Sequence, residues 1–294
     1  MSKSSHTLGI KLNYQVLGLN NNNTSPLIFL IHGAGGDLHH YASVTPHLIE
    51  SGYRVLLMDV RFHGLSQPTK AIEQVNFSFE DVIHDMNWIL RQVKQEFYAG
   101  HTIQLFLGGL SMGGMISLLY AQSKACGNYT WDNIILRGVI PMAAGIPCME
   151  LERQGWDVYR ERKATPEFLE WSKSAIIQSS LTLEGQKETE RAIKSISDAA
   201  MYECMVAIAM QLPNPSNPPI SYKPTVFVPM LLILPEGDEY TRKEIELLHQ
   251  INLKHGISSH LIVVPNAGHM IVLDKSKDVS QYIVEFCSRV MTTK

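Results

Sequence analysis

The sequence of 294 residues lacks paired cysteines and long apolar runs, and each absence excludes a class of protein. Its four cysteines form no Cys-x-x-Cys pair, which argues against a zinc site or a disulfide framework and favours reduced, buried thiols. No stretch approaches the ~18 apolar residues that cross a membrane. The N-terminus also has no apolar segment of signal-peptide length. We therefore expect a cytoplasmic protein without a transmembrane segment.

Charge of either sign is also scarce. The formal net charge is −3, so the sequence favours no polyanionic partner and we expect no nucleic-acid binding. Apolar residues make up 45% of the chain, which is enough for a sizeable core. The length fits one large α/β domain or two small ones. Nothing in the sequence indicates an oligomeric state.

Several apolar segments have the pattern of strands. Residues 8–17 alternate apolar and polar side chains, which predicts a half-buried strand near a sheet edge. Continuous apolar runs are typical of strands that are covered on both faces. Such runs occupy residues 27–31, 55–58, 103–107, 134–140, 226–234 and 260–264.

Helical spacing appears between these strands. The clearest stripe of apolar residues spans residues 79–97. Similar patterns cover residues 112–120, 244–253 and 279–290. Because strands and helices alternate, the sequence predicts an α/β fold with a mostly parallel central sheet and helices on both faces.

The interval 145–224 breaks the alternation, because it has helical patterns and no buried strand. Five prolines near its end indicate a stiff return to the sheet. We expect a helical cap over the carboxyl edge of the sheet, where ligands bind in open α/β folds. Residues 1–144 and 225–294 would then form the two parts of the core.

Gly109–Gly113 matches the pattern G-x-S-x-G between a predicted strand and a predicted helix. In that setting the serine lies on a tight, strained turn, with its hydroxyl exposed at a helix N-terminus. The helix dipole there favours a developing negative charge. Ser111 is therefore the candidate nucleophile.

A serine hydroxyl needs a positioned base to become a nucleophile. His269 follows the last predicted strand, where the chain order nucleophile, acid, histidine puts the base. Asp238 lies between Ser111 and His269, after a strand and a Gly237 turn that directs its side chain inward. It is the candidate acid that orients the imidazole. Glu236 and Glu239 are neighbours, and spacing alone does not exclude them.

Hydrolysis through a serine also requires two backbone N–H donors for the oxyanion. One is expected from Met112, the residue after the nucleophile. The second is expected from the glycine-rich loop at residues 32–37, where we choose Ala34 and keep Gly35 as the nearest competitor. This loop has neither nucleotide-binding pattern, so we expect no cofactor.

The segment Asp59–Ser66 contains an aspartate, an arginine and a histidine after the second buried strand. Asp59 and His63 have no third neighbour to complete a catalytic metal site. We interpret these residues as structural, shaping the loop beneath the serine turn, and expect no metal.

Together these blocks resemble the α/β-hydrolase superfamily, and the resemblance covers the chain outside the cap. The combination is similar to the enol-lactonase, small-ester hydrolase and monoacylglycerol-lipase-like branches. One departure is Phe62, which stands where D-x-R-G-H-G blocks have glycine. The matching blocks are HG-x-G at His32, D-x-R-x-H-G-x-S at Asp59, GLSMGG at Gly109, the acid turn at Asp238 and the G-H pair at Gly268.

The resemblance implies cleavage of a carboxylic ester or lactone through an acyl-enzyme, because a serine rather than an aspartate occupies the turn. The aromatic and methionine residues of the cap suit a small apolar substrate. Trp156, Trp171 and Tyr202 are the candidate substrate-binding residues, beside Tyr159, Phe168, Met201, Met205 and Met210. Carbon–carbon bond hydrolysis by the same triad and a ligand-binding receptor or scaffold with this fold remain alternatives.

Overall fold

In a computed structural model, residues 2–7, 9–71, 75–124, 129–145, 155–212 and 226–292 are described, the first six by their backbone alone. Within this part of the chain the strands form one sheet. The strands are β1 (Ser2–Thr7), β2 (Ile10–Leu17), β3 (Leu27–Ile31), β4 (Arg54–Met58), β5 (Gln67–Pro68), β6 (Ile103–Leu110), β7 (Thr130–Trp131), β8 (Ile134–Met142), β9 (Met230–Pro235) and β10 (Ser259–Val264).

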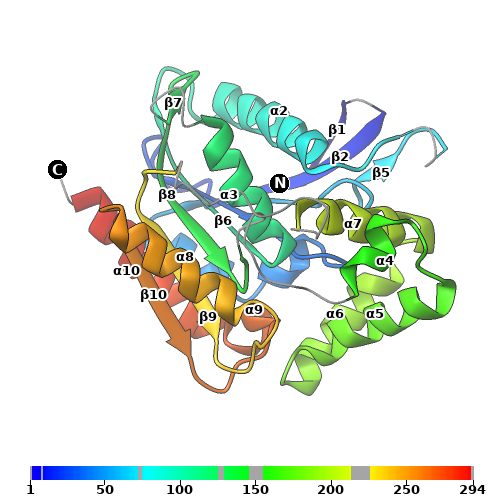
Figure 1. The fold of residues 1–294 in the computed structure, drawn as a ribbon. Helices are drawn as coiled ribbons and strands as arrows, with labels where there is room; N and C mark the ends of the chain where they lie inside the picture. The colour runs from blue at the N-terminus through cyan, green and yellow to red at the C-terminus, as the bar shows by residue number, and fades with distance from the viewer. Residues whose placement is uncertain are drawn as a thin grey trace.

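The main path of the sheet has the order β1-β2-β4-β3-β6-β8-β9-β10. Along this path every pair in the series β4-β3-β6-β8-β9-β10 is parallel, whereas β2 pairs antiparallel with β1 and β4. The predicted mostly parallel sheet is therefore confirmed. Helices surround it (Figure 1). They are η1 (Leu38–Tyr41), α1 (Thr45–Glu50), α2 (Phe79–Phe97), α3 (Met112–Lys124), α4 (Trp156–Arg160), α5 (Pro166–Gln178), α6 (Leu183–Lys194), α7 (Asp198–Gln211), α8 (Arg242–Lys254), α9 (Ile271–Asp274) and α10 (Ser276–Thr292).

Two apolar layers cover the two faces of the sheet. Side chains of β3 alternate between them: Phe29 packs with α2 and α3, while Leu30 packs with α1 and α10. This alternation follows from the two-residue period of a strand, and it makes a continuously apolar sequence the signature of β3. Among the described residues, no helix is long and apolar enough to cross a membrane.

Helix α2 has the bounds that its apolar stripe predicts. The Ser78 hydroxyl accepts a hydrogen bond from the Asp81 N–H and so caps the first turn. Val82, Met86 and Ile89 are buried on the sheet side of the helix. The cap residue therefore begins α2, and burial of one face stabilises it.

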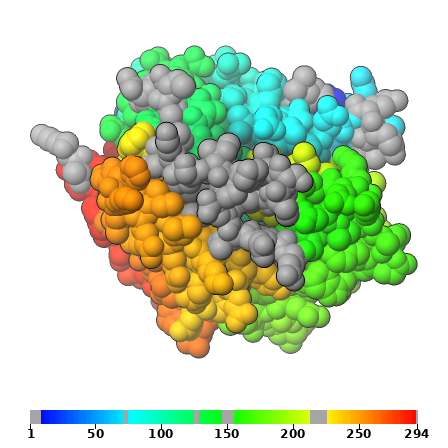
Figure 2. Space-filling view, in the orientation of Figure 1, coloured from blue at the N-terminus to red at the C-terminus, as the bar shows by residue number. Residues whose placement is uncertain are grey.

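Helices α4 to α7 lie between β8 and β9, and the described residues of this interval contain no strand. They form a separate layer beside the sheet (Figure 1). In the space-filling view their green surface adjoins the yellow-to-orange surface of the chain after β9 (Figure 2). This is the helical insertion that the sequence predicts. The proline-rich return and the boundary at residue 224 lie outside the described residues.

Two parts of the sheet differ from the sequence expectations. The apolar run at residues 226–234 becomes a strand only from Met230. Pro229 precedes it and has no N–H to donate to a ladder, and Phe227 is 63% exposed. Strand β1 has no apolar alternation, and its pairing with β2 is what defines it.

Asp59 organises the loop after β4. Its buried carboxylate accepts hydrogen bonds from Asn13 Nδ2 at 2.7 Å, the Leu38 N–H at 2.9 Å and the Leu65 N–H at 2.8 Å. Burial raises the pKa of Asp59, and these donors oppose that rise. The side chain thus joins β2, η1 and its own loop, the structural role predicted for it.

Phe62 has a φ of +71°, in the left-handed region that favours glycine. Its N–H donates to the Ser66 carbonyl at 2.7 Å, which closes the turn. Its ring is 1% exposed and lies 5.5 Å from the ring of Phe77. Burial of the ring therefore offsets the backbone strain at this departure from the family pattern.

We expect Phe62→Gly to lower the free energy of unfolding by about 1–4 kcal/mol, since loss of a buried ring outweighs relief of left-handed strain. Phe62→Ala loses the ring and keeps the strain, so it should be about 1–2 kcal/mol less stable than Phe62→Gly. Urea unfolding of both variants measures the difference. Equal stability of the two would contradict this account.

Candidate active site

Ser111 lies between β6 and α3 with a φ of +51°. A serine in this region is strained and needs support from its surroundings. Its N–H donates to the Met142 carbonyl at 2.8 Å, and its carbonyl accepts from the Met115 N–H at 3.0 Å. The side chain is partly exposed at the carboxyl end of β6.

The glycines on either side of Ser111 let this turn pack against β3. A Cβ on Gly109 would lie 2.7 Å from the carbonyl oxygen of Ile31. A Cβ on Gly113 would overlap the same carbonyl group. Both positions therefore exclude a side chain, which explains the spacing of the G-x-S-x-G pattern.

Asp238 and His269 meet at the ends of β9 and β10. His269 Nδ1 lies 2.8 Å from Asp238 Oδ2. Because a carboxylate only accepts, Nδ1 carries the proton and Nε2 is left as the base. Asp238 is 1% exposed and also accepts hydrogen bonds from the Tyr240 N–H and the Thr241 hydroxyl.

Burial acts to raise the pKa of the Asp238 carboxyl, because it disfavours the charged form. The charge of His269 and the hydrogen bonds from His269, Thr241 and Tyr240 outweigh burial, so the pKa lies below its ordinary value. Asp238 is therefore ionised at neutral pH and can stabilise a positively charged imidazole.

The structure separates Asp238 from the other two acids. The side chains of Glu236 and Glu239 are exposed, and Glu236 accepts from the Asn266 N–H at 3.1 Å. Of these three carboxylates, only that of Asp238 is hydrogen-bonded to His269 within the described chain. In the same part of the chain, Ser111 and His269 share no side-chain hydrogen bond, so acid and base are joined while the serine is held separately by its turn.

The loop after β3 lies beside Ser111. A Cβ on Gly33 would be 3.4 Å from the Cβ of Ser111. The Gly35 N–H is occupied, since it donates to His63 Nε2 at 3.2 Å. The Ala34 N–H has no hydrogen-bond partner among the described residues. Met112 is the first residue of α3, where an N–H has no partner within the helix.

Two buried histidines, His32 and His63, hold this loop. His63 Nδ1 donates to the Arg61 carbonyl at 3.0 Å, which leaves Nε2 free to accept from Gly35. His32 Nε2 accepts from the Val60 N–H at 2.9 Å. Burial lowers the pKa of His63 to about 3 and that of His32 to about 4, so both rings are neutral. Neither ring was predicted from the sequence to accept a backbone N–H of these loops.

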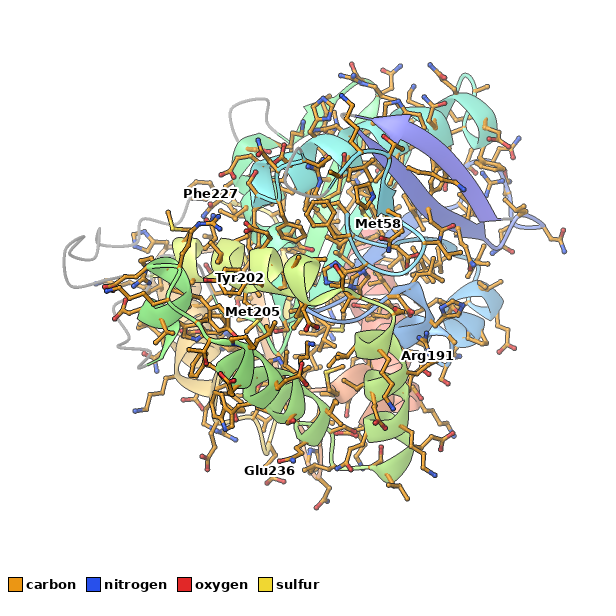
Figure 3. All side chains as sticks on the ribbon, turned by 90° about the vertical axis from the view of Figure 1, so that its right-hand side faces the viewer. Met58, Arg191, Tyr202, Met205, Phe227 and Glu236 are labelled. Carbon is orange, nitrogen blue, oxygen red and sulfur yellow. The ribbon has the colours of Figure 1, made fainter. Side chains whose placement is uncertain are left out.

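The predicted substrate-binding residues of the cap lie in an aromatic cluster. Trp156 and Tyr202 are partly buried, with ring centroids 6.0 Å and 5.9 Å from that of Tyr159. Trp171 is 64% exposed and stacks on Phe168 at 5.4 Å. Tyr202 lies on α7 in Figure 3. Contact of these residues with a substrate stays a prediction.

Other cap residues lie directly over the site. A Cβ on Gly35 would lie 2.8 Å from Ile193 Cγ1 and 3.5 Å from Met201 Cε. Cys204 Sγ lies 3.4 Å from Met112 Sδ. Ile193 and Cys204 could not be predicted, because the inward face of a cap helix depends on how the cap sits on the sheet.

Asp274 joins the cap to the loop that carries the histidine. Its carboxylate accepts hydrogen bonds from Ser180 Oγ at 2.5 Å, the Leu181 N–H at 3.0 Å and Thr182 Oγ1 at 3.0 Å. It also accepts from the Gly268 N–H at 2.9 Å, next to His269. One carboxylate thus fixes both the α5–α6 connection and the position of the base.

Arg191 makes a second connection between the cap and the core. Its Nη2 atom lies 2.8 Å from Asp37 Oδ2 and 2.7 Å from Glu188 Oε1. Arg191 lies on α6 (Figure 3), and Asp37 is in the loop after β3. Burial acts to raise the pKa of Asp37, but Arg191 outweighs it and the pKa is lowered. The cap is thereby fixed both to the loop after β3 and to the segment that carries His269.

The chain belongs to the α/β-hydrolase fold family, whose sequence pattern matches residues 26–276. No curated protein sequence matched the chain significantly.

Solved structures share the fold at low sequence identity. An esterase from Thermogutta terrifontis has a TM-score of 0.75 at 19% identity, over 99% of this chain and 100% of its own. The enol-lactonase from Burkholderia xenovorans LB400 has a TM-score of 0.73 at 19% identity, over 97% of this chain and 100% of its own. An esterase from Exiguobacterium antarcticum has a TM-score of 0.70 at 20% identity, over 99% of this chain and 100% of its own. These likenesses show the fold.

Asp274→Ala should lower the free energy of unfolding by about 1.5–3 kcal/mol, because it removes a charged acceptor from several donors. The exposed segment around Leu181 should then be cut faster in limited proteolysis. Asp278→Ala, an exposed carboxylate four residues further on, is the control and should behave like wild type. Unchanged proteolysis in Asp274→Ala would argue against its role as a cap anchor.

Asp238→Asn should cost about 1–3 kcal/mol of stability near neutral pH. A carboxyl whose pKa is lowered on folding stabilises the protein above its unfolded pKa, and this stabilisation is lost as the pH falls through the folded pKa. The gap in stability between wild type and Asp238→Asn should therefore narrow as the pH falls below about 4. Urea unfolding midpoints above and below this pH test it, and a constant gap at all pH values would refute it.

Proposed function

We propose that the protein is a serine hydrolase that cleaves a carboxylic ester or a lactone through an acyl-enzyme on Ser111. The observation that carries the proposal is the 2.8 Å hydrogen bond between His269 and the buried, ionised Asp238. This pair lies at the edge of the sheet where the strained turn presents Ser111. A buried carboxylate that orients an imidazole, at the same edge of the sheet as a partly exposed serine, provides the groups that acyl transfer requires.

In the proposed reaction Ser111 Oγ attacks the carbonyl carbon while His269 Nε2 takes its proton. Asp238 holds the imidazole and stabilises its charged form. The N–H groups of Ala34 and Met112 receive the oxyanion, since the competing Gly35 N–H is occupied by His63. The protonated His269 then supplies the leaving group with a proton, and a water activated by His269 releases the acyl group.

The substrate is proposed to be small and apolar. Ile193, Met201 and Cys204 place apolar side chains against the loop after β3 and against Met112. We propose that the cap spans residues 145–224 and that Trp156, Trp171 and Tyr202 contribute to binding. The names of two structural relatives, an esterase and an enol-lactonase, support this substrate class.

A fluorophosphonate probe should label the wild type, and Ser111→Ala should abolish both labelling and hydrolysis of p-nitrophenyl esters. Loss of the nucleophile lowers kcat by about 10⁴-fold or more. Ser117→Ala is a matched control in α3, because its hydroxyl only donates to the Gly113 carbonyl. Absence of labelling in wild type, or equal labelling of Ser111→Ala, would favour a binding protein instead.

Substrate class is then resolved with p-nitrophenyl esters of increasing chain length and with simple lactones. We expect the highest kcat/KM among short or medium esters or lactones. Labelling by the probe without turnover of any ester or lactone would favour carbon–carbon bond hydrolysis by the same residues.

A further inference from the structure

Strands β3 and β6 are parallel neighbours that separate at the active site. Their last paired residues are Ile31 and Gly109. Beyond this point the segment after β3 forms the loop that carries Ala34, and the segment after β6 forms the turn that carries Ser111 and Met112. The width of this fork determines the separation of the two proposed oxyanion donors.

Tyr41 fills the base of the fork. It lies at the end of η1 and is 0% exposed. Its hydroxyl donates to the Ile31 carbonyl at 2.8 Å and accepts from the Leu110 N–H at 3.0 Å. The directions are unambiguous, because a carbonyl only accepts and an N–H only donates. One phenol therefore bridges the two backbones where they leave the sheet.

We propose that Tyr41 is a positioning residue that sets the distance between the oxyanion donors of Ala34 and Met112. The inference rests on the proposed function, which it deepens. Ala34 lies three residues beyond Ile31, and Met112 lies two residues beyond Leu110. A shift of either backbone at Tyr41 is therefore passed to a donor through a very short segment.

The helix that carries Tyr41 is itself hydrogen-bonded to the loop after β4. The Leu38 N–H at the start of η1 donates to Asp59 at 2.9 Å, which fixes the helix that carries Tyr41. Burial raises the pKa of Tyr41 far above its ordinary value, so the hydroxyl keeps the proton that it donates to Ile31. Oxyanion donors act only when they lie about 2.7–3.1 Å from the developing charge, so small displacements reduce the rate.

Tyr98 offers a control in the apolar layer on the other face of the sheet. It is also 0% exposed, and its hydroxyl donates to the Ser25 carbonyl at 2.9 Å. Ser25 precedes β3, so this bond lies at the opposite, amino end of the strand. If Tyr41 were purely structural, removal of either hydroxyl would lower stability without a selective loss of kcat.

The test compares Tyr41→Phe with Tyr98→Phe on a p-nitrophenyl ester that the wild type hydrolyses. We expect Tyr41→Phe to lower kcat by about 10–100-fold with KM changed less than about 3-fold, because displaced donors lose transition-state contacts alone. Tyr98→Phe should also lose thermal stability, by the smaller amount expected for one hydrogen bond, and keep kcat within about 2-fold. A phenylboronic acid, which forms a tetrahedral adduct on serine, should bind Tyr41→Phe weaker by the same factor as kcat falls.

The outcomes distinguish failure of the inference about Tyr41 from failure of the proposed function. Equal kcat and boronate affinity in the two variants would overturn the inference while leaving the proposed function intact. A wild type that hydrolyses no ester and takes up no probe would overturn both. If Tyr41→Phe does not fold, amide hydrogen exchange of Leu110 in the wild type decides: exchange as slow as in the strands supports the bridge, and exchange at loop rates overturns it.

Discussion

The contact between the serine turn and the end of β3 is the constraint on which the rest of the site depends. Ser111 adopts a positive φ only because Gly109 and Gly113 allow the turn to lie against the Ile31 carbonyl. The same contact brings the loop after β3 next to the nucleophile. Strain at one residue is thus maintained by close packing of its neighbours, as expected of a backbone that surrounding structure over-determines.

The cap is attached to the loops of the core, and the attachment points are chemically distinct. Asp274 collects hydrogen bonds from the α5–α6 connection and from Gly268. Arg191 forms an ion pair with Asp37, whose carboxylate also receives the His39 N–H at the start of η1. Both anchors end on segments that carry active-site groups. The cap is therefore hydrogen-bonded both to the segment before His269 and to the loop after β3.

Much of the fold could be predicted because its strands are buried on both faces. Helix α2 was predicted with its observed bounds, since one apolar stripe and one capping serine define it. Strand β1 could not be predicted, because its pairing with β2 rather than its composition makes it a strand. The start of β9 was placed too early, because apolar residues before Pro229 resemble a strand until the missing N–H is considered.

The site could be predicted in part, for a similar reason. Local chain geometry favoured Asp238 over Glu236 and Glu239, and the structure shows it alone of the three beside His269. The sequence alone could not distinguish Ala34 from Gly35 as the oxyanion donor, because only the folded position of His63 shows that the Gly35 N–H is occupied. The exposure of Trp171 likewise depends on how the helices of the cap pack together.

The neutral state of His63 gives the loop after β3 a lower limit in pH. As long as Nε2 is unprotonated it accepts the Gly35 N–H, and this persists down to about pH 3, the pKa of the buried ring. Below that value the acceptor becomes a donor and repels the Gly35 amide. Acid therefore removes the hydrogen bond that holds the Gly35 amide in this loop. The loop that carries Ala34 would thus lose one of its supports in strong acid.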